Sequence, residues 1–193
     1  MPRLTESSRQ QRRQAIAAAA MRCFARDGFA NTSMADIIKE AGSSAGSVYS
    51  HFAGKAELLR FAAGSAVDDL IATVSDELPS ERTPASVVSH LIQASGDPAH
   101  AQMLLEIWAE APRDPDLLDI SRQSLNQLRE LVRTALLPWC EQRPSAGPAR
   151  PTAAALADAV VAAIQGFLVT VSIDRDGDAD ALAAHVVEVF ERL

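Results

Sequence analysis

The stretch TSMADIIKEAGSSAGSVYSHFAGKAELL, residues 32–59, decides the fold of this 193-residue chain. Ser33 followed by Asp36 matches the S-x-x-D capping box that opens a helix. Gly42 then closes that helix, because glycine takes the left-handed conformation after a helix at little cost. The pattern predicts a short helix that ends in a tight glycine turn.

A further helix of this stretch begins after Ser44, whose hydroxyl can cap it. Val48 and Phe52 lie four residues apart and are expected to face inward. The side that faces away from the core then carries Gly46, Ser47, Tyr49 and Ser50. The sequence thus predicts helix, tight turn, helix, with a small and polar outer face on the last helix.

Working outward, residues 9–27 read as a preceding helix that Gly28 ends, and residues 55–78 as a following helix of some two dozen residues. Glycines, prolines and polar runs divide the remainder into helices near 84–95, 98–111, 115–142, 152–173 and 179–192. Hydrophobic residues make up 48% of the chain but aromatic residues only 5%, and no alternating strand pattern occurs. We therefore expect an all-α fold of about nine helices.

The charge is distributed unevenly along the chain. Residues 1–60 carry nine Lys and Arg against five Asp and Glu, a net of +4, whereas residues 61–193 carry nine against twenty, a net of −11. A positively charged N-terminal segment favours binding to the phosphates of a nucleic acid, and the negatively charged remainder of the chain is repelled by them. Chance variation of surface charge is the competing interpretation.

Export and metal binding receive no support from the sequence. The N-terminus is polar, and no uninterrupted apolar run is long enough to span a bilayer, so we expect a cytoplasmic protein without a membrane partner. Cys23 and Cys140 lie far apart and stand in no metal-ligand or redox spacing. The run DRDGDAD, residues 174–180, lacks the glycine and glutamate positions of a calcium loop, so an interhelical turn with Asp178 or Asp180 as cap is the better interpretation.

The helix pair resembles the helix-turn-helix of the TetR family of bacterial regulators, whose pattern runs T-x-x-x-I-A-x-x-A-G-x-S-x-G-x-x-Y-x-H-F-x-x-K-x-x-L. In this sequence the residues at those positions are Ser33, Ile37, Ile38, Ala41, Gly42, Ser44, Gly46, Tyr49, His51, Phe52, Lys55 and Leu58, with Ser33 in place of the pattern's Thr and Ile38 in place of its Ala. The resemblance implies a DNA-binding domain over residues 1–54, with three helices, and a helical effector-binding and dimerisation domain over residues 55–193.

The expected contacts with double-stranded operator DNA come from the polar groups of this motif. The candidates are Ser33, Ser44, Ala45, Gly46, Ser47, Tyr49, Ser50, His51 and Lys55. Gly46 and Ala45 let the helix approach closely, hydroxyls donate to phosphates or base edges, and Lys55 begins a helix where an anion is favoured. Family members often carry Arg or Lys in place of Ala35 and Ala45, so direct base readout is expected to be sparse. Arg9, Arg12 or Arg13 could add minor-groove contacts from a flexible arm.

The resemblance also implies a small-molecule effector and a homodimer. The candidate effector pocket, expected to be broad and largely apolar, is lined by Phe61, Leu91, Met103, Leu104, Ile107, Trp108, Leu125, Phe167 and Val171, and plain core packing is the alternative for each. Polar groups that could orient the ligand, or lie on the surface, are His90, Gln93, His100 and Gln165. The helices over residues 152–193 are expected to pair with their copies in the dimer.

Catalysis is not expected, and neither is a cofactor or a metal. No nucleophile elbow, zinc spacing, phosphate loop or Glu-x-x-His pair occurs. The function expected is a homodimeric repressor that a ligand releases from a palindromic operator. The alternatives are a regulator without effector, an activator or, from another class, an all-α enzyme.

Overall fold

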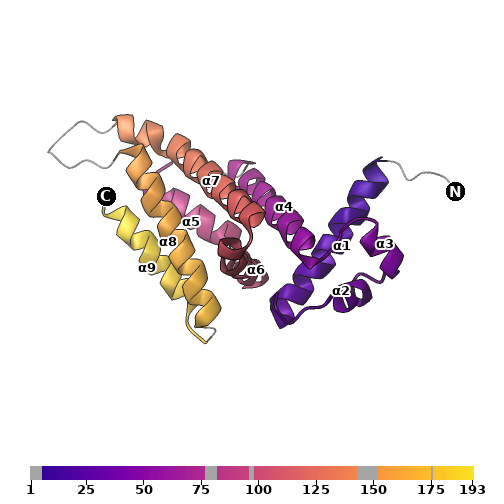
Figure 1. Cartoon of the computed structure of the whole chain (residues 1–193). Coiled ribbons are helices and arrows are strands. Elements are labelled where there is room, and N and C mark those ends of the chain that lie inside the picture. Colours follow the sequence, from indigo (N-terminus) through magenta and orange to yellow (C-terminus); the bar gives the residue numbers. More distant parts are fainter. Residues whose placement is uncertain (1–5, 77–81, 96–97, 143–151, 175) are drawn as a thin grey trace. The chain divides into compact units, whose positions relative to one another are not determined.

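The computed structural model describes residues 6–76, 82–95, 98–142, 152–174 and 176–193 (Figure 1). These residues form nine α-helices and one 3-10 turn, and no strand occurs among them. The α-helices are α1 (Glu6–Asp27), α2 (Met34–Glu40), α3 (Ala45–Tyr49), α4 (Lys55–Asp76), α5 (Pro84–Ser95), α6 (Pro98–Glu110), α7 (Pro115–Gln142), α8 (Ala153–Ile173) and α9 (Ala179–Glu191). The prediction of an all-α fold is confirmed.

The glycines end the helices where the sequence indicated. Gly28 follows α1 with φ of +79° and Gly42 follows α2 with φ of +56°, both in the left-handed region that disfavours a side chain. The amide of Gly28 donates to the carbonyl of Phe24 at 2.8 Å, which satisfies one of the last carbonyls of α1. The two turns therefore have the geometry that the sequence predicted.

The N-terminal caps also form as expected. The Ser33 hydroxyl accepts the amide of Asp36 at 3.2 Å while the Asp36 carboxylate accepts the amide of Ser33 at 2.9 Å, which completes a capping box. Ser44 caps α3 by accepting the amide of Ser47 at 3.2 Å. These bonds satisfy backbone donors that would otherwise lack partners at the two helix starts.

The chain divides into two compact units. The N-terminal unit contains residues 1–66 and 102–121, and the C-terminal unit contains residues 67–101 and 122–193. This division by packing differs from the expected functional boundary after residue 54, because the first part of α4, most of α6 and the start of α7 pack with the N-terminal helices. The functional boundary itself stays a prediction.

The N-terminal unit has a core to which all its helices contribute. Its fully buried side chains include Ile16 and Phe24 of α1, Ile37 of α2, Val48 of α3 and Leu58 of α4. Met103, Ile107 and Leu117 from α6 and α7 join the same cluster. Burial of side chains of this size stabilises the unit by roughly 1.5 to 3 kcal/mol each.

The C-terminal unit is built around α5, which packs against α8 and α9 (Figure 1). Leu91 of α5, Leu136 of α7 and Val160 of α8 are fully buried there. α8 has a mean hydropathy of 1.9 over its most apolar window and is long enough to cross a membrane, by length and composition only, with 39% of that window buried. Sequence inspection missed this because Asp158 and Gln165 interrupt the apolar run.

Candidate nucleic-acid interface

The helix α3 has one side in the core and the other in solvent. Val48 is completely buried and Phe52, just beyond the helix, is 1% exposed. On the outer side, Ala45, Gly46, Tyr49 and Ser50 are exposed and Ser47 is half-buried. A Cβ added at Gly46 would meet no atom within 4 Å, so packing within the unit does not require a glycine at this position.

Tyr49 is the largest group on this outer face. Its side chain is 52% exposed, which is unusual for an aromatic residue next to a fully buried valine. An exposed phenol supplies one hydroxyl donor and an apolar ring, a combination that suits a phosphate or a base edge. The placement agrees with the face expected from the helical spacing of Val48 and Phe52.

The serines of the motif serve the fold and face solvent at the same time. Ser33 and Ser44 are exposed while their hydroxyls cap α2 and α3. The hydroxyl of Ser50 donates to the carbonyl of Ser47 at 2.7 Å. Bonds from the hydroxyl and amide of Ser33 lower the pKa of Asp36, so this carboxylate stays ionised as part of the cap. The hydroxyls of Ser33 and Ser50 already donate, to the Asp36 carboxylate at 2.5 Å and to the Ser47 carbonyl, so they can only accept a further bond. The hydroxyl of Ser44 accepts the amide of Ser47 and can still donate.

His51 is less available than the sequence suggested. Its Nδ1 is buried and has no hydrogen-bond partner among the described residues, while the residue as a whole is half-buried. Burial, together with the positive charges of Arg9, Arg13 and Arg12, lowers the pKa of this imidazole. At neutral pH the ring is therefore uncharged and offers a neutral donor or acceptor, not a cation.

Lys55 has a different role from the expected phosphate contact. Its ammonium donates to the carbonyls of Phe29 at 2.7 Å, Thr32 at 3.0 Å and Ala30 at 3.2 Å, and it lies 4.6 Å from the centre of the Phe29 ring. An ammonium has three donors, and all three are used within the unit. The sequence located Lys55 at the start of a helix, but the side chain turns back to bind the loop between α1 and α2.

The arginines of the expected flexible arm belong to α1. Arg9, Arg12 and Arg13 all lie within this helix, which begins at Glu6, so the prediction of an arm at these residues is wrong. Arg12 donates to the hydroxyl of Ser43 at 3.0 Å, and Arg13 donates to the carbonyl of His51 at 3.1 Å. These bonds attach the first half of α1 to the turn before α3 and to the residues after it.

Two more arginines of α1 are paired with α2. The Glu40 carboxylate accepts from Arg22 at 2.8 Å and lies 3.6 Å from Arg26, and the two guanidinium groups lower the pKa of that carboxyl. Some of the excess positive charge over residues 1–60 is therefore neutralised by ion pairs that hold α1 against α2.

Comparison with known proteins agrees with this geometry. Residues 16–61 match the family model described as bacterial regulatory proteins, tetR family, and residues 79–193 match the model described as BetI-type transcriptional repressor, C-terminal. The chain belongs to the TetR family. It is therefore a DNA-binding transcriptional regulator with a helix-turn-helix at its N-terminus, and its family is one of regulators.

The relatives of this TetR-family chain support the same assignment. It is 31% identical over 102 residues to the transcriptional regulator SrpR of Pseudomonas putida, a match that covers 53% of this chain and about half, 48%, of SrpR. A transcriptional regulator from Rhodococcus sp. Rha1 has the same fold, with a TM-score of 0.77, 23% identity and 92% of each chain covered. A regulator from Saccharomonospora viridis in complex with choline gives a TM-score of 0.76 at 21% identity, with 94% of this chain and 96% of that chain covered.

The residues expected to line an effector pocket fall into two groups in this TetR-family chain. Phe61, Met103, Leu104, Ile107 and Trp108 belong to the N-terminal unit, where all but Leu104 lie in or against its core cluster. The C-terminal unit holds Leu91, Leu125, Phe167 and Val171. Sequence spacing could not separate these groups, because the periodicity of α6 is the same whichever unit it packs into.

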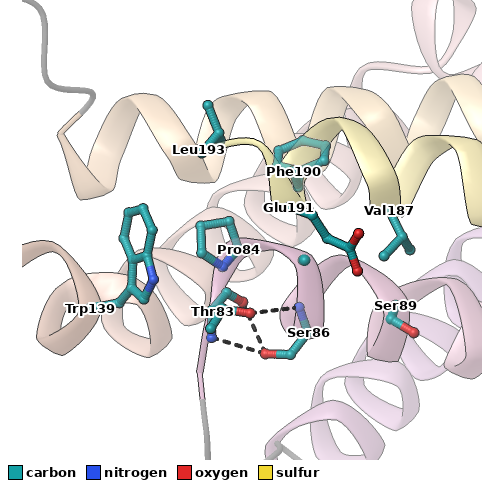
Figure 2. Close-up of a pocket in the computed structure, with 10 residues that line it drawn as sticks. Thr83, Pro84, Ser86, Ser89, Trp139, Val187, Phe190, Glu191 and Leu193 are labelled. Atoms are coloured by element: carbon teal, nitrogen blue, oxygen red, sulfur yellow. Dashed lines mark hydrogen bonds between the residues drawn. The ribbon is translucent and has the colours of Figure 1, made fainter.

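A cavity of about 440 Å³ in the C-terminal unit contains none of the expected pocket residues (Figure 2). It lies where the start of α5 and the ends of α7 and α9 meet. Its lining residues are Thr83, Pro84, Ala85, Ser86, Ser89, Trp139, Val187, Phe190, Glu191 and Leu193. No motif in the sequence pointed to this set, since it joins residues from three distant helices.

Two of the polar residues that the sequence singled out for a ligand have clear positions on α5. His90 has its Nε2 buried without a hydrogen-bond partner among the described residues, whereas Gln93 is exposed and donates to Ser89 at 3.4 Å. Gln165 of α8 is half-buried. The side chain of His100 lies outside the described part of the structure, so its prediction is untested.

Proposed function

We propose that this chain is a homodimeric repressor that binds a palindromic operator and leaves it when a small, largely apolar molecule binds. The observation that carries the proposal is α3, whose inner side chains are fully buried while Gly46, Tyr49 and Ser50 face solvent. A short helix anchored in this way can enter the major groove with its N-terminal residues toward the bases. Its outer face is the candidate DNA surface.

The contacts proposed on this surface are sorted by chemistry. Tyr49 and the hydroxyl of Ser44 suit backbone phosphates, and Ser47 and Ser50 lie where base edges would come. The hydroxyl of Ser33 already donates its proton to the Asp36 carboxylate at 2.5 Å, so it has no donor left for a phosphate. Ala45 and Gly46 allow close approach, and His51 adds a neutral donor at the edge of the surface. Lys55 is removed from the expected contacts, because its donors are already used.

The dimer is proposed from the outward face of α8. Ala155, Ala159, Ala162 and Gly166 recur at helical spacing and are exposed, and Ile173 at the end of the helix is 77% exposed. On α9, Val189 is 64% exposed. Small residues let a second helix approach closely, and such a face on the most apolar helix of the chain suits a copy of itself. Two recognition helices roughly 34 to 36 Å apart would then read two half-sites of a palindrome.

Two observations support the proposed binding of a small-molecule effector: the family match, and buried polar atoms without hydrogen-bond partners among the described residues of the C-terminal unit. His90 Nε2 and the hydroxyls of Ser95 and Ser172 are buried without partners among the described residues. Buried polar groups usually have a partner, which a ligand or an ordered water can supply. The ligand is expected against Leu91, Leu125, Phe167 and Val171 of the same unit. The description of the matched C-terminal model as a repressor supports repression, and the choline bound by the Saccharomonospora viridis protein supports a small-molecule ligand. The cellular place proposed is the cytoplasm, where the operator lies.

The experiment that tests the proposal is selection of bound duplexes from a random DNA library, followed by affinity measurements. The selected site should be a palindrome. Tyr49→Ala should bind it about tenfold more weakly, since one charge-assisted hydrogen bond is lost. Leu137→Ala, which removes an exposed side chain of α7 in the C-terminal unit, is the matched control and should bind as the original protein does. Equal affinities for the two variants would overturn the proposed surface.

A further inference from the structure

The turn between α1 and α2, residues 28–32, is tightly organised within the N-terminal unit. Gly28 starts it with a positive φ, and its carbonyl accepts the hydroxyl of Thr32 at 2.8 Å and the amide of Thr32 at 3.2 Å. Thr32 is 2% exposed, which is rare for a polar residue in a turn. The residue that follows is Ser33, the cap of α2, so the path of this turn determines where α2 begins.

One side of the turn is held by a positive charge from α4. The Lys55 ammonium binds the carbonyls of Phe29, Ala30 and Thr32, and it also lies over the Phe29 ring. Three carbonyls that converge on one ammonium fix the direction of three peptide planes. These three bonds add to those that Thr32 makes to Gly28 and Asn31 makes to Asp27, so Lys55 restricts the conformation of the turn further.

The other side of the turn is held by a negative charge from α6. The Glu106 carboxylate accepts the amide of Phe29 at 2.9 Å through Oε2. Its Oε1 lies 3.7 Å from the place that a Cβ on Gly28 would occupy, so the carboxylate also borders the glycine. Met103, about one turn of helix earlier, and Ile107, the next residue, are buried in the core of the same unit and fix the position of Glu106.

Phe29 is thus bonded at its amide and at its carbonyl by side chains of opposite charge from two different helices. Glu106 is separated from Phe29 by 77 positions in the sequence and lies outside the matched helix-turn-helix segment of residues 16–61. Charged hydrogen bonds to backbone groups are stronger than neutral ones. Glu106 itself is not among the proposed DNA contacts, so its effect on DNA binding must pass through the turn.

We propose that Glu106 is a positioning residue for DNA binding, which with Lys55 clamps the turn at residues 28–32 and so sets the place of α2 beneath the recognition helix. Without the carboxylate the part-buried amide of Phe29 loses its partner, and the turn samples other conformations. Only the fraction of molecules with the correct turn then binds operator tightly, so the apparent Kd rises by the inverse of that fraction. The inference rests on the proposed operator binding and adds a residue of α6 to it.

The test compares three variants of Glu106 in the full chain, with the selected operator as probe. Glu106→Leu removes the acceptor and should raise the Kd about fivefold or more, which corresponds to a binding-competent fraction of about one fifth. Glu106→Gln keeps an acceptor oxygen at the same reach and should recover most of the affinity. Glu106→Asp keeps the charge, but its side chain is too short to reach the amide of Phe29, so this variant should bind operator as weakly as Glu106→Leu. It replaces Glu106→Leu in the test if the leucine variant does not fold. Glu110→Leu, also on α6, is the matched control.

Hydrogen exchange of the segment around Phe29 supplies the readout that general destabilisation would not reproduce. In Glu106→Leu and Glu106→Asp this segment should exchange faster while the core of the C-terminal unit keeps its protection. The preferred operator sequence should not change, because no base contact is altered. An affinity unchanged in both variants, or a Glu106→Gln variant as weak as Glu106→Asp, would overturn the clamp. If Tyr49→Ala is also without effect, the proposed DNA surface fails as well; if Tyr49→Ala weakens binding and Glu106→Asp does not, the clamp alone fails.

Discussion

The guanidinium of Arg13 lies 4.5 Å from the centre of the Phe52 ring. It also lies 4.8 Å from the ring of Phe61, and one of its nitrogens donates to the carbonyl of His51. Through these cation–π and hydrogen-bond contacts, Arg13 of α1 holds His51 and Phe52, the residues that follow α3, against α1 and α4. A residue that the sequence offered as a possible DNA contact is a structural element of the unit.

Arg13→Met should lower the free energy of unfolding by about 1 to 2 kcal/mol, because it loses the ring contacts and leaves the His51 carbonyl without this donor. Urea unfolding followed by circular dichroism measures the change. Arg9→Met, at an exposed position one turn earlier on α1, is the control and should have a smaller effect. Equal loss in the two variants would contradict the structural role.

Lys55→Met should destabilise the protein by about 1 to 3 kcal/mol, because three carbonyls lose a charged donor. The slope of the logarithm of operator affinity against the logarithm of salt concentration should stay unchanged, since no phosphate contact is lost. Lys39→Met, at an exposed position on α2, is the control for removing one positive charge. If the salt slope fell by about one unit in Lys55→Met, Lys55 would have to be counted as a phosphate contact after all.

His51 should make stability depend on pH below its ordinary pKa. Burial, with Arg9, Arg13 and Arg12, lowers the pKa of the folded imidazole, so the unfolded chain takes up a proton first as the pH falls. The stability contributed by neutral His51 is therefore present above the unfolded pKa of about 6.5 and is lost as the pH falls through the folded pKa. His51→Gln should flatten this dependence in urea titrations at successive pH values, and His185→Gln, at an exposed position, should not.

Ala162→Glu or Gly166→Glu should convert the protein to monomers and abolish tight operator binding together, because a charge would be buried between paired α8 helices. Sedimentation velocity and operator titration measure the two effects. Ala154→Glu is the control, since Ala154 is exposed one turn before Asp158, which pairs with Arg129 of the same subunit at 3.0 Å. A folded monomeric variant that still bound tightly would remove the dimer from the proposal.

His90→Phe should weaken binding of effector candidates while it leaves operator affinity within about twofold. The measurement is a thermal-shift screen of small, largely apolar molecules against the original protein, repeated with the variant. Gln93→Leu, at an exposed position on the same helix, should keep every shift. Shifts preserved in His90→Phe would mean that the buried Nε2 serves no ligand.

The sequence predicted the helices well, because their ends are marked locally. Gly28 and Gly42 adopt the left-handed conformation where they were expected to, and Ser33, Ser44 and Asp178 cap α2, α3 and α9. The outer face of α3 also followed from spacing alone, since Val48 in the core fixes the direction of Tyr49.

The partners of charged side chains could not be predicted in the same way. Lys55 stands at the start of a helix in the sequence, but whether its long side chain reaches phosphate or folds back to Phe29 depends on where the turn lies in space. The bond from Phe29 to Glu106 joins residues that no local pattern connects. For a similar reason, the sequence could not show that Trp108 and Leu91 belong to different units. An apolar stripe shows that one side of a helix is buried, but not which neighbouring helix covers it.

The exposed small residues of α8 have a consequence for the cell. Under the proposed dimer, a subunit alone leaves the outward face of α8 open to water, so mass action stabilises the folded protein as its own concentration rises. The number of chains in the cell would then control both the lifetime of the repressor and the concentration of the dimer that binds a palindrome. A cell with few copies would lose repression more steeply than in proportion to the number of chains it makes.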